Sequence, residues 1–221
     1  MKQILVAVDA SGRSDEAVLV GLDLARRLGA KLELVHGVGR YAHWPVMARA
    51  RAEAMETEAA QAARETLAAH LRTRRHQGAA LKLGSTPIEE FLTVAVVTPA
   101  KVILVHADRT RAELIVLGSH RRRGVFDFGG TARSVLAKAQ CPVWVQNGWM
   151  RETKHVLAPI DLSEHSLAAL ATGRDLAKKV PLGRSETDSV SAPKCDHTDW
   201  KYVDIENDGT LKLTVSVDNP L

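Results

Sequence analysis

The segment Ile4–Val8 constrains the fold of this chain most, because it is apolar at every position and is followed at once by Asp9. A strand of this kind must be buried on both faces, as in a parallel sheet that is covered by helices. Asp15–Leu28 repeats apolar side chains at helical spacing and is closed by Gly29, and Lys31–His36 reads as a second strand. The chain therefore opens with a β-α-β unit, whose crossover we expect to be right-handed.

Strand and helix signals continue to alternate after this unit. Aromatic residues make up only 4% of the chain, so the core must consist of Val, Leu, Ile and Ala, which favours buried parallel strands. Ser14 is expected to cap the first helix, and the stretch 77–90 is ambiguous. The order of elements predicts an α/β fold with an open, doubly wound parallel sheet flanked by helices. Further helices are predicted over 46–75, 99–108 and 131–139, and further strands over 91–97, 113–117 and 142–146.

The beginning of the chain occurs a second time. A shift of 152 residues aligns Ile4–Arg27 with Val156–Lys179 without a gap, so we interpret the second segment as a duplicated β-α start. Only 69 residues (221 − 152) follow that shift, which is too few for a full copy. The identical pairs are Leu5/Leu157, Asp9/Asp161, Ser11/Ser163, Ser14/Ser166, Ala17/Ala169, Gly21/Gly173, Asp23/Asp175, Leu24/Leu176 and Ala25/Ala177.

The domain organisation follows from this repeat. We expect a first α/β domain over 1–148, a truncated second copy over 154–181, and a divergent tail over 182–221. The tail begins as a polar loop, and two strand patterns then flank Asn207-Asp208-Gly209, which predicts a C-terminal β-hairpin.

Charge and cysteine usage narrow the class of protein. Basic residues number 30 against 26 acidic ones, and we interpret this net charge of +4 as a solvated face, so nucleic acid is not an expected partner. Cys141 is expected to be a buried structural thiol, and Cys195 with His197 offers too few ligands for a metal site. Without a disulfide framework, a signal peptide or an apolar run long enough to span a membrane, the expected location is the cytoplasm.

Two features fall at the carboxyl ends of the predicted strands, where open parallel sheets bind ligands. Asp9 ends the first strand and is placed to accept hydrogen bonds from a ribose hydroxyl or an adenine amino group. The loop that begins at Gly118 leads to Gly129-Gly130-Thr131, whose glycines and helix start suit a phosphate. Thr131 could cap that helix or donate its hydroxyl to phosphate. In the alternative interpretation, Asp9 and Ser11 only organise a turn.

The histidines do not complete a catalytic group. His36, at a strand end, is expected to be a structural histidine or to line the pocket, and His120 lies in the loop. No Ser or Cys stands with an oriented acid and base. We expect no catalytic residue, and at most a slow ATPase.

Three segments together resemble the universal stress protein family: Ile-Leu-Val-Ala-Val-Asp, Ile-Val-Leu-Gly-Ser-His, and Val-Leu-Ala-Lys-Ala-Gln-Cys-Pro-Val-Trp-Val. The resemblance covers about residues 1–147 and again 154–180. It implies a five-stranded sheet of order 3-2-1-4-5, a stress-response role, and a homodimer formed through the last strand, Pro142–Gln146. In one branch of the family it also implies bound ATP, or another adenine nucleotide, with Mg²⁺ as its companion ion.

The phosphate loop of that branch, Gly-x2-Gly-x9-Gly-Ser/Thr, is matched only in part. Arg121 stands where the second glycine belongs, and Gly129-Gly130-Thr131 arrives early. A side chain at position 121 could block phosphate or supply a cation in place of an amide. The nucleotide-binding positions that the resemblance implies are Asp9, Ala10, Gly37, Val38, Leu117, Gly118, His120, Arg121, Gly129, Gly130 and Thr131.

Two function classes therefore stay open besides slow ATP hydrolysis. The first is a binding module whose surface responds to an adenine nucleotide. The second is a nucleotide-independent protein of the same fold that acts through dimerisation or another protein partner.

Overall fold

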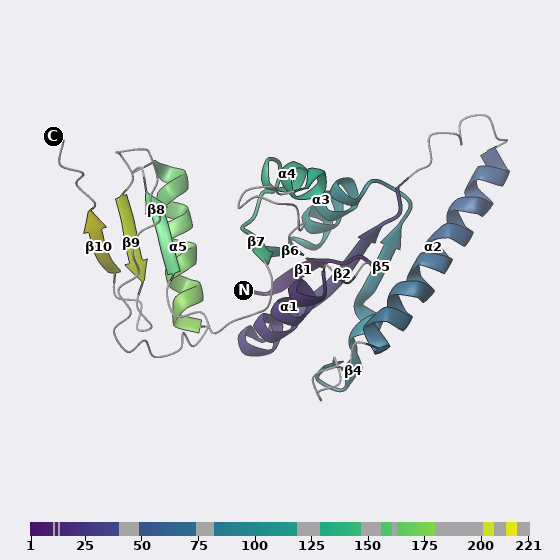
Figure 1. Cartoon of the computed structure of the whole chain (residues 1–221), viewed down its shortest axis with the longest axis horizontal. Coiled ribbons are helices and arrows are strands. Elements are labelled where there is room, and N and C mark those ends of the chain that lie inside the picture. Colours follow the sequence, from purple (N-terminus) through teal and green to yellow (C-terminus); the bar gives the residue numbers. More distant parts are fainter. Residues whose placement is uncertain are drawn as a thin grey trace. The chain divides into compact units, whose positions relative to one another are not determined.

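The computed structural model describes residues 1–10, 12, 14–39, 49–73, 82–118, 129–146, 156–160, 163–179, 201–205 and 211–215. The chain divides into two compact units, Met1–Met150 and Arg151–Leu221 (Figure 1).

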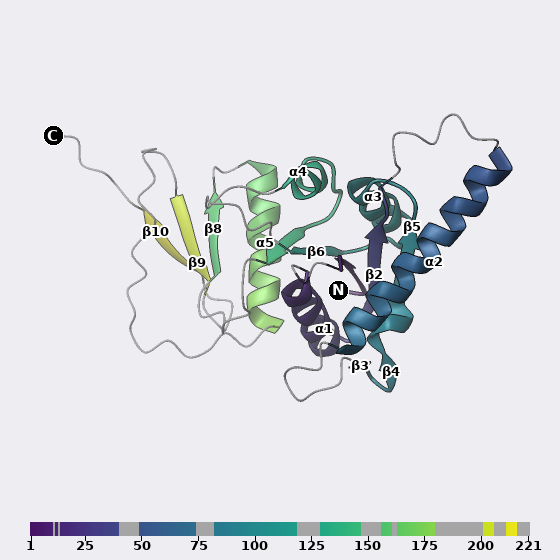
Figure 2. The same ribbon diagram turned by 45° about the vertical axis from the view of Figure 1, so that its right-hand side comes forward.

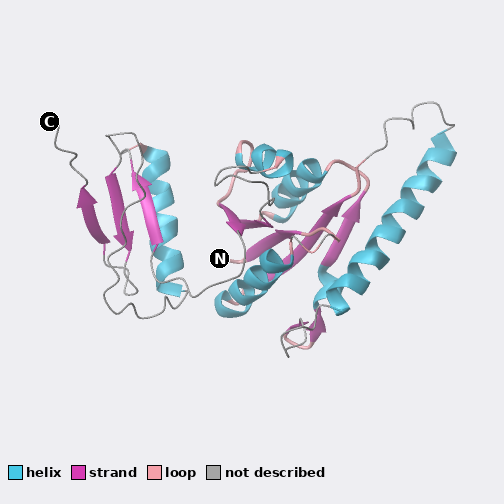
Figure 3. Ribbon diagram, in the orientation of Figure 1, coloured by secondary structure: helices cyan, strands magenta, loops and turns pink. Residues whose placement is uncertain are grey.

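The first unit alternates strands and helices along most of its length, as Figure 3 shows by colour. Its main elements are β1 (Gln3–Ala7), α1 (Asp15–Leu28), β2 (Lys31–Gly37), α2 (Arg49–Thr73), β5 (Leu92–Ala95), α3 (Pro99–Thr110), β6 (Leu114–Gly118), α4 (Gly130–Leu136) and β7 (Val143–Gln146). The stretch that was ambiguous in sequence holds a small antiparallel hairpin and a 3-10 helix, namely β3 (Lys82–Leu83), β4 (Thr86–Pro87) and η2 (Ile88–Phe91).

The five main strands form one parallel sheet of order β5-β2-β1-β6-β7. When only these strands are counted along the chain, the order is 3-2-1-4-5, and the predicted α/β class is confirmed. The strand numbers differ because the β3–β4 hairpin was not predicted. Phe91 belongs to η2, so the third strand of the sheet is shorter than the sequence indicated.

The core lies on both faces of β1, whose residues Ile4, Leu5 and Val6 are completely buried. Leu5 faces the cluster that α3 and α4 complete with Ile103 and Val135. Successive side chains of a strand point to opposite faces, so Ile4 and Val6 face the other layer, where α1 and α2 lie (Figure 2). The first strand is therefore apolar at every position because both of its faces are buried, as the sequence predicted.

Cys141 packs at the border of the α3–α4 cluster and is half-buried. Burial raises the pKa of its thiol, because the thiolate would lose hydration. A thiol with a raised pKa is a poor nucleophile at neutral pH, which agrees with the structural role expected for it.

The second unit starts with a strand and a helix, as the repeat predicts, and continues with two strands in an antiparallel sheet. It contains β8 (Val156–Ile160), α5 (Glu164–Lys179), β9 (Lys201–Ile205) and β10 (Leu211–Val215). β9 and β10 form the predicted hairpin, with Leu213 opposite Val203. β9 also pairs antiparallel with β8, giving a sheet of order β10-β9-β8. The strand-helix alternation of the first unit thus stops after α5.

The described helices lack the combination of length and apolar character that a membrane crossing requires.

Gly21 fixes how closely α1 approaches the sheet. A Cβ at this position would lie 2.3 Å from Cγ2 of Val6 and 3.6 Å from Cδ1 of Leu32. Only glycine lets the helix backbone lie this near to β1, and Gly173 occupies the matching position of α5.

We expect Gly21→Ala to lower the free energy of unfolding by up to about 2 kcal/mol, because an overpacking cost of about 1–3 kcal/mol outweighs the roughly 1 kcal/mol gained from helix propensity. Urea denaturation followed by circular dichroism measures the change. Gly39→Ala is the matched control, since a Cβ there would meet open space. Equal stability of the two variants would contradict this account of α1 packing.

Candidate functional site

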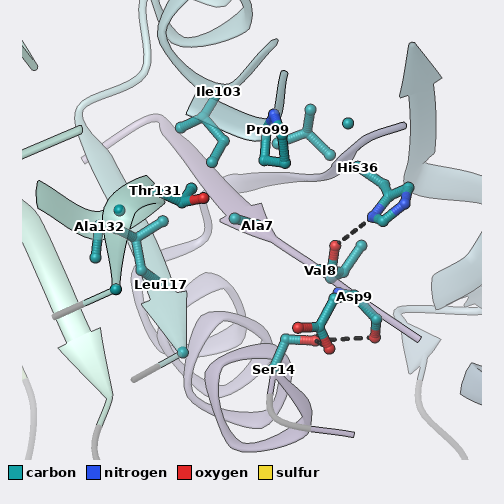
Figure 4. A pocket seen from close by; sticks show the side chains of 15 residues that line it. Ala7, Val8, Asp9, Ser14, His36, Pro99, Ile103, Leu117, Thr131 and Ala132 are labelled. Atoms are coloured by element: carbon teal, nitrogen blue, oxygen red, sulfur yellow. Dashed lines mark hydrogen bonds between the residues drawn. The ribbon is translucent and has the colours of Figure 1, made fainter. Parts of the chain in front are cut away.

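The described residues enclose a cavity of about 260 Å³ at the carboxyl ends of β1, β2 and β6 (Figure 4). β1 lies between β2 and β6 in the sheet. The connection that follows β1 leads to β2 on one side, whereas β6 on the other side continues toward β7, so the two connections run in opposite directions from this point. Such a switch point is where open parallel sheets bind ligands. The cavity is lined by Ala7, Val8, Asp9, Ser14, Val35, His36, Gly37, Pro99, Ile103, Leu117, Gly118, Gly129, Gly130, Thr131 and Ala132.

The predicted site residues fall into three groups. Those that line the cavity are Asp9, Gly37, Leu117, Gly118, Gly129, Gly130 and Thr131. Ala10 and Val38 are described but are not among its lining residues. His120 and Arg121 lie outside the described residues, as do Ser11, Asp161, Cys195 and His197.

Fixed hydrogen bonds hold the carboxyl end of β1. The Val8 N–H donates to the Val35 carbonyl oxygen at 3.0 Å. Nδ1 of His36 lies 2.7 Å from the Val8 carbonyl oxygen, as Figure 4 shows. Because a carbonyl oxygen only accepts, Nδ1 of His36 carries the hydrogen. His36 therefore both lines the cavity and braces the peptide that precedes Asp9.

The prediction that the Ser14 side chain caps α1 is wrong. Ser14 occupies the N-cap position of α1, but its side chain makes no capping hydrogen bond to the helix. The hydroxyl oxygen instead accepts the Asp9 N–H at 2.8 Å. The same hydroxyl lies 3.2 Å from the Asp9 carbonyl oxygen and 3.4 Å from its Oδ1. Ser14 thus joins the start of α1 to the acidic end of β1.

Gly37 is glycine for a reason that its sequence position did not reveal. A Cβ there would lie 2.6 Å from Cα and 2.8 Å from N of Pro99, and 2.9 Å from the Val97 carbonyl oxygen. These neighbours are backbone atoms, so they cannot rotate away. The next residue, Val38, uses its N–H to donate to the Ala95 carbonyl oxygen at 2.9 Å. Any contact from Val38 to a ligand must therefore use another of its atoms.

The predicted phosphate segment forms the opposite wall. Gly129 is the N-cap of α4, and Gly130 is its first helical residue, so Thr131 does not cap the helix as one prediction had it. Figure 4 shows the Thr131 hydroxyl on the side of the cavity that Ala7 also lines. A Cβ built on Gly130 would meet nothing within 4 Å, so this wall is open beside the glycine.

The remaining wall is apolar, and Leu117 is the one residue of this wall that was predicted as a site position. Val35, Pro99, Ile103, Leu117 and Ala132 line the cavity, although the sequence pattern placed the strand residues among them in the core. The signal that could have found them is their position: each lies near the end of a buried strand or in the first turns of the next helix.

Among the described lining residues, one carboxylate group carries charge. Asp9 is the only carboxylate among the described lining residues, and these include no Lys or Arg. No group of three or more His, Cys, Asp or Glu side chains able to hold a metal occurs in the described part of the chain. The described site therefore offers one acidic acceptor, one braced histidine, two hydroxyls and an apolar wall.

Comparison with known proteins assigns the chain to a family. Residues 1–146 match the model of the family described as the Universal stress protein family, whereas a search of the curated proteins finds no match. Among solved structures, the chain is similar to hypothetical protein MJ0577, whose structure served to assign a biochemical function. That likeness has 16% identity and a TM-score of 0.51, and covers 68% of this chain and 98% of the other.

Two further structures are similar to the same part of the chain. Universal stress protein UspA from Lactobacillus plantarum has 23% identity, a TM-score of 0.48, and coverage of 65% of this chain and 96% of its own. The universal stress protein from Archaeoglobus fulgidus, solved in complex with dAMP, has 22% identity, a TM-score of 0.40, and coverage of 66% and 97%. At these identities the likeness concerns the fold. The family match over 1–146, well over half of the 221 residues, shows that this chain belongs to the universal stress protein family.

Proposed function

We propose that this chain is a stress-response binding module that holds ATP or another adenine nucleotide in the cavity at the end of β1. The observation that carries the proposal is the cavity itself. It combines an acceptor fixed on a strand end, Asp9, with a facing wall of glycines at the start of α4, in a chain of the universal stress protein family.

The two sides of the cavity match the two ends of a nucleotide. Apolar side chains such as Val35 and Ile103 offer a surface for a base, and Asp9 is an acceptor for a nucleoside donor. Gly129 and Gly130 leave space through which a phosphate could approach the backbone. Because the described wall supplies one carboxylate, any Mg²⁺ would be held mainly by the phosphates and water.

Binding of the nucleotide is tested with Gly130→Ala. The added Cβ meets open space in the protein, so the fold should persist while the close approach of phosphate is lost. We expect isothermal titration calorimetry to detect ATP, ADP or AMP with the unaltered chain, and affinity to fall about tenfold in the variant, the size of one lost charge-assisted hydrogen bond.

Gly39→Ala, which also meets open space but lies outside the cavity lining, should bind as the unaltered protein does. No heat and no thermal shift at millimolar nucleotide would refute the proposal.

We also propose that two copies pair along β7. Among the described residues, β7 pairs only with β6, and an unpaired strand edge is a template for another strand. The Ile115 N–H donates to the Pro142 carbonyl oxygen at 3.0 Å, and Ile115 lies opposite Val143. Backbone groups alternate in direction along a parallel strand, so those of Val143 and Val145 point away from β6.

Val145→Pro removes one outward N–H and leaves the ladder to β6 intact, because proline lacks the donor. We expect light scattering at high micromolar concentration to give a dimer mass for the unaltered chain and a mass closer to the monomer for the variant. Val145→Thr, which keeps the N–H and the β-branched shape, should remain dimeric. A monomer mass for the unaltered protein would contradict the pairing.

A further inference from the structure

Ser14 is a buried polar residue with an unusual use of its hydroxyl. Its exposed fraction is 6%, and it stands at the start of a helix without capping it. We propose that Ser14 is a positioning residue, which holds the Asp9 carboxylate in the orientation that accepts a hydrogen bond from a bound nucleoside. This inference rests on the proposed nucleotide function. It makes Ser14 responsible for how well the site distinguishes nucleosides that offer Asp9 a hydrogen-bond donor from those that do not.

Among the described residues, the hydrogen-bond contacts of the Ser14 hydroxyl go to Asp9. Its oxygen accepts the Asp9 N–H at 2.8 Å, and its own hydrogen has two acceptors within reach, the Asp9 carbonyl oxygen at 3.2 Å and Oδ1 at 3.4 Å. A hydroxyl carries one hydrogen. By contacting both the main chain and the carboxylate of Asp9, Ser14 restricts the rotation of that side chain.

The rest of the strand end is already fixed. The Val8 N–H is bonded to Val35, and the Val8 carbonyl oxygen accepts from His36. The backbone that carries Asp9 is therefore anchored from β2, and the carboxylate is the part whose direction still depends on a neighbour. Ser14, directly before α1, lies within hydrogen-bond distance of that carboxylate.

The second unit shows what a serine at a helix start ordinarily does. Ser163, directly before α5, accepts the Ser166 N–H at 3.2 Å, which is a capping hydrogen bond. Ser166 is the repeat partner of Ser14 and donates its hydroxyl to the Ser163 carbonyl oxygen at 3.0 Å. In the first unit, α1 forgoes the capping bond and the hydroxyl turns to Asp9, as expected of a residue that serves the site.

An oriented Asp9 carboxylate should distinguish nucleotides that offer it a hydrogen-bond donor from those that do not. An ionised carboxylate only accepts hydrogen bonds, so Asp9 recognises a donor on the nucleoside, either a ribose hydroxyl or the adenine amino group. A ligand that lacks this donor cannot form the hydrogen bond to the carboxylate and binds less tightly. If Ser14 holds the carboxylate in place, the loss of its hydroxyl should reduce this discrimination more than it reduces affinity as such.

The experiment measures dissociation constants by calorimetry for AMP, 2′,3′-dideoxy-AMP and IMP. We expect the unaltered chain to bind one of the two analogues about tenfold or more weakly than AMP, the size of a hydrogen bond to a charged group, and this identifies the donor. Ser14→Ala should reduce that ratio to about two- or threefold, whereas Ser14→Thr, which keeps a hydroxyl, should retain it. Ser166→Ala, the matched change in the second unit, should leave the ratio unaltered.

Asp9→Asn separates positioning from general support of the fold. The ratio should collapse in this variant, and adding Ser14→Ala to it should change the ratio no further, because the two residues act as one unit. If Ser14→Ala fails to give a folded circular dichroism spectrum, Ser14→Gly takes its place, since glycine is accepted at N-caps.

Each remaining outcome decides the matter. Equal weakening of AMP and its analogue by Ser14→Ala would mean that Ser14 is merely structural. Tight nucleotide binding without discrimination in the unaltered chain would overturn the inference and leave the proposed function standing. Absence of binding to all three nucleotides would refute the proposed function, and the inference would fall with it.

Discussion

The burial of β1 on both faces is the constraint on which the rest of the first unit depends. Ile4, Leu5 and Val6 have no exposed surface, with β2 and β6 on either side and helices above and below. A central strand fixed in this way cannot shift along its axis without exposing apolar side chains on both faces. The position of its carboxyl end along the strand direction is therefore fixed relative to β2 and β6. The cavity beside Asp9 lies where these strand ends meet.

Burial of a strand leaves its last polar groups to be satisfied by other means. Beyond Ala7 the chain leaves β1, and the N–H and carbonyl groups of Val8 are paired with β2, through Val35 and His36. The N–H of Asp9 is paired with Ser14. Buried polar groups without partners are costly, so these bonds keep the strand end ordered. The same bonds aim the carboxylate of Asp9, and stability and site geometry thus share one set of interactions.

The sequence predicted the elements well because their signals are local. Apolar runs marked β1 and β6, and Pro99 marked the first residue of α3. Features set by tertiary contacts were not predictable. Nothing in the sequence shows that the Pro99 backbone crowds Gly37, or that Ser14 turns to Asp9 in place of α1. The β3–β4 hairpin was missed because its strands are two residues long, too short for any periodicity.

In its described residues, the second unit places a segment that resembles β1 and α1 in sequence in a different kind of sheet. Its segment keeps the Ser163 and Ser166 pair, yet Ser163 caps α5 and the helix begins earlier relative to the repeat than α1 does. In the described residues, β8 pairs only with β9, which runs antiparallel to it. A crevice at a switch point needs parallel strands whose carboxyl ends meet on the same edge. The cavity beside Asp9 thus depends on β6 and α4 as much as on β1, so a strand and helix that resemble β1 and α1 in sequence do not supply all of its walls.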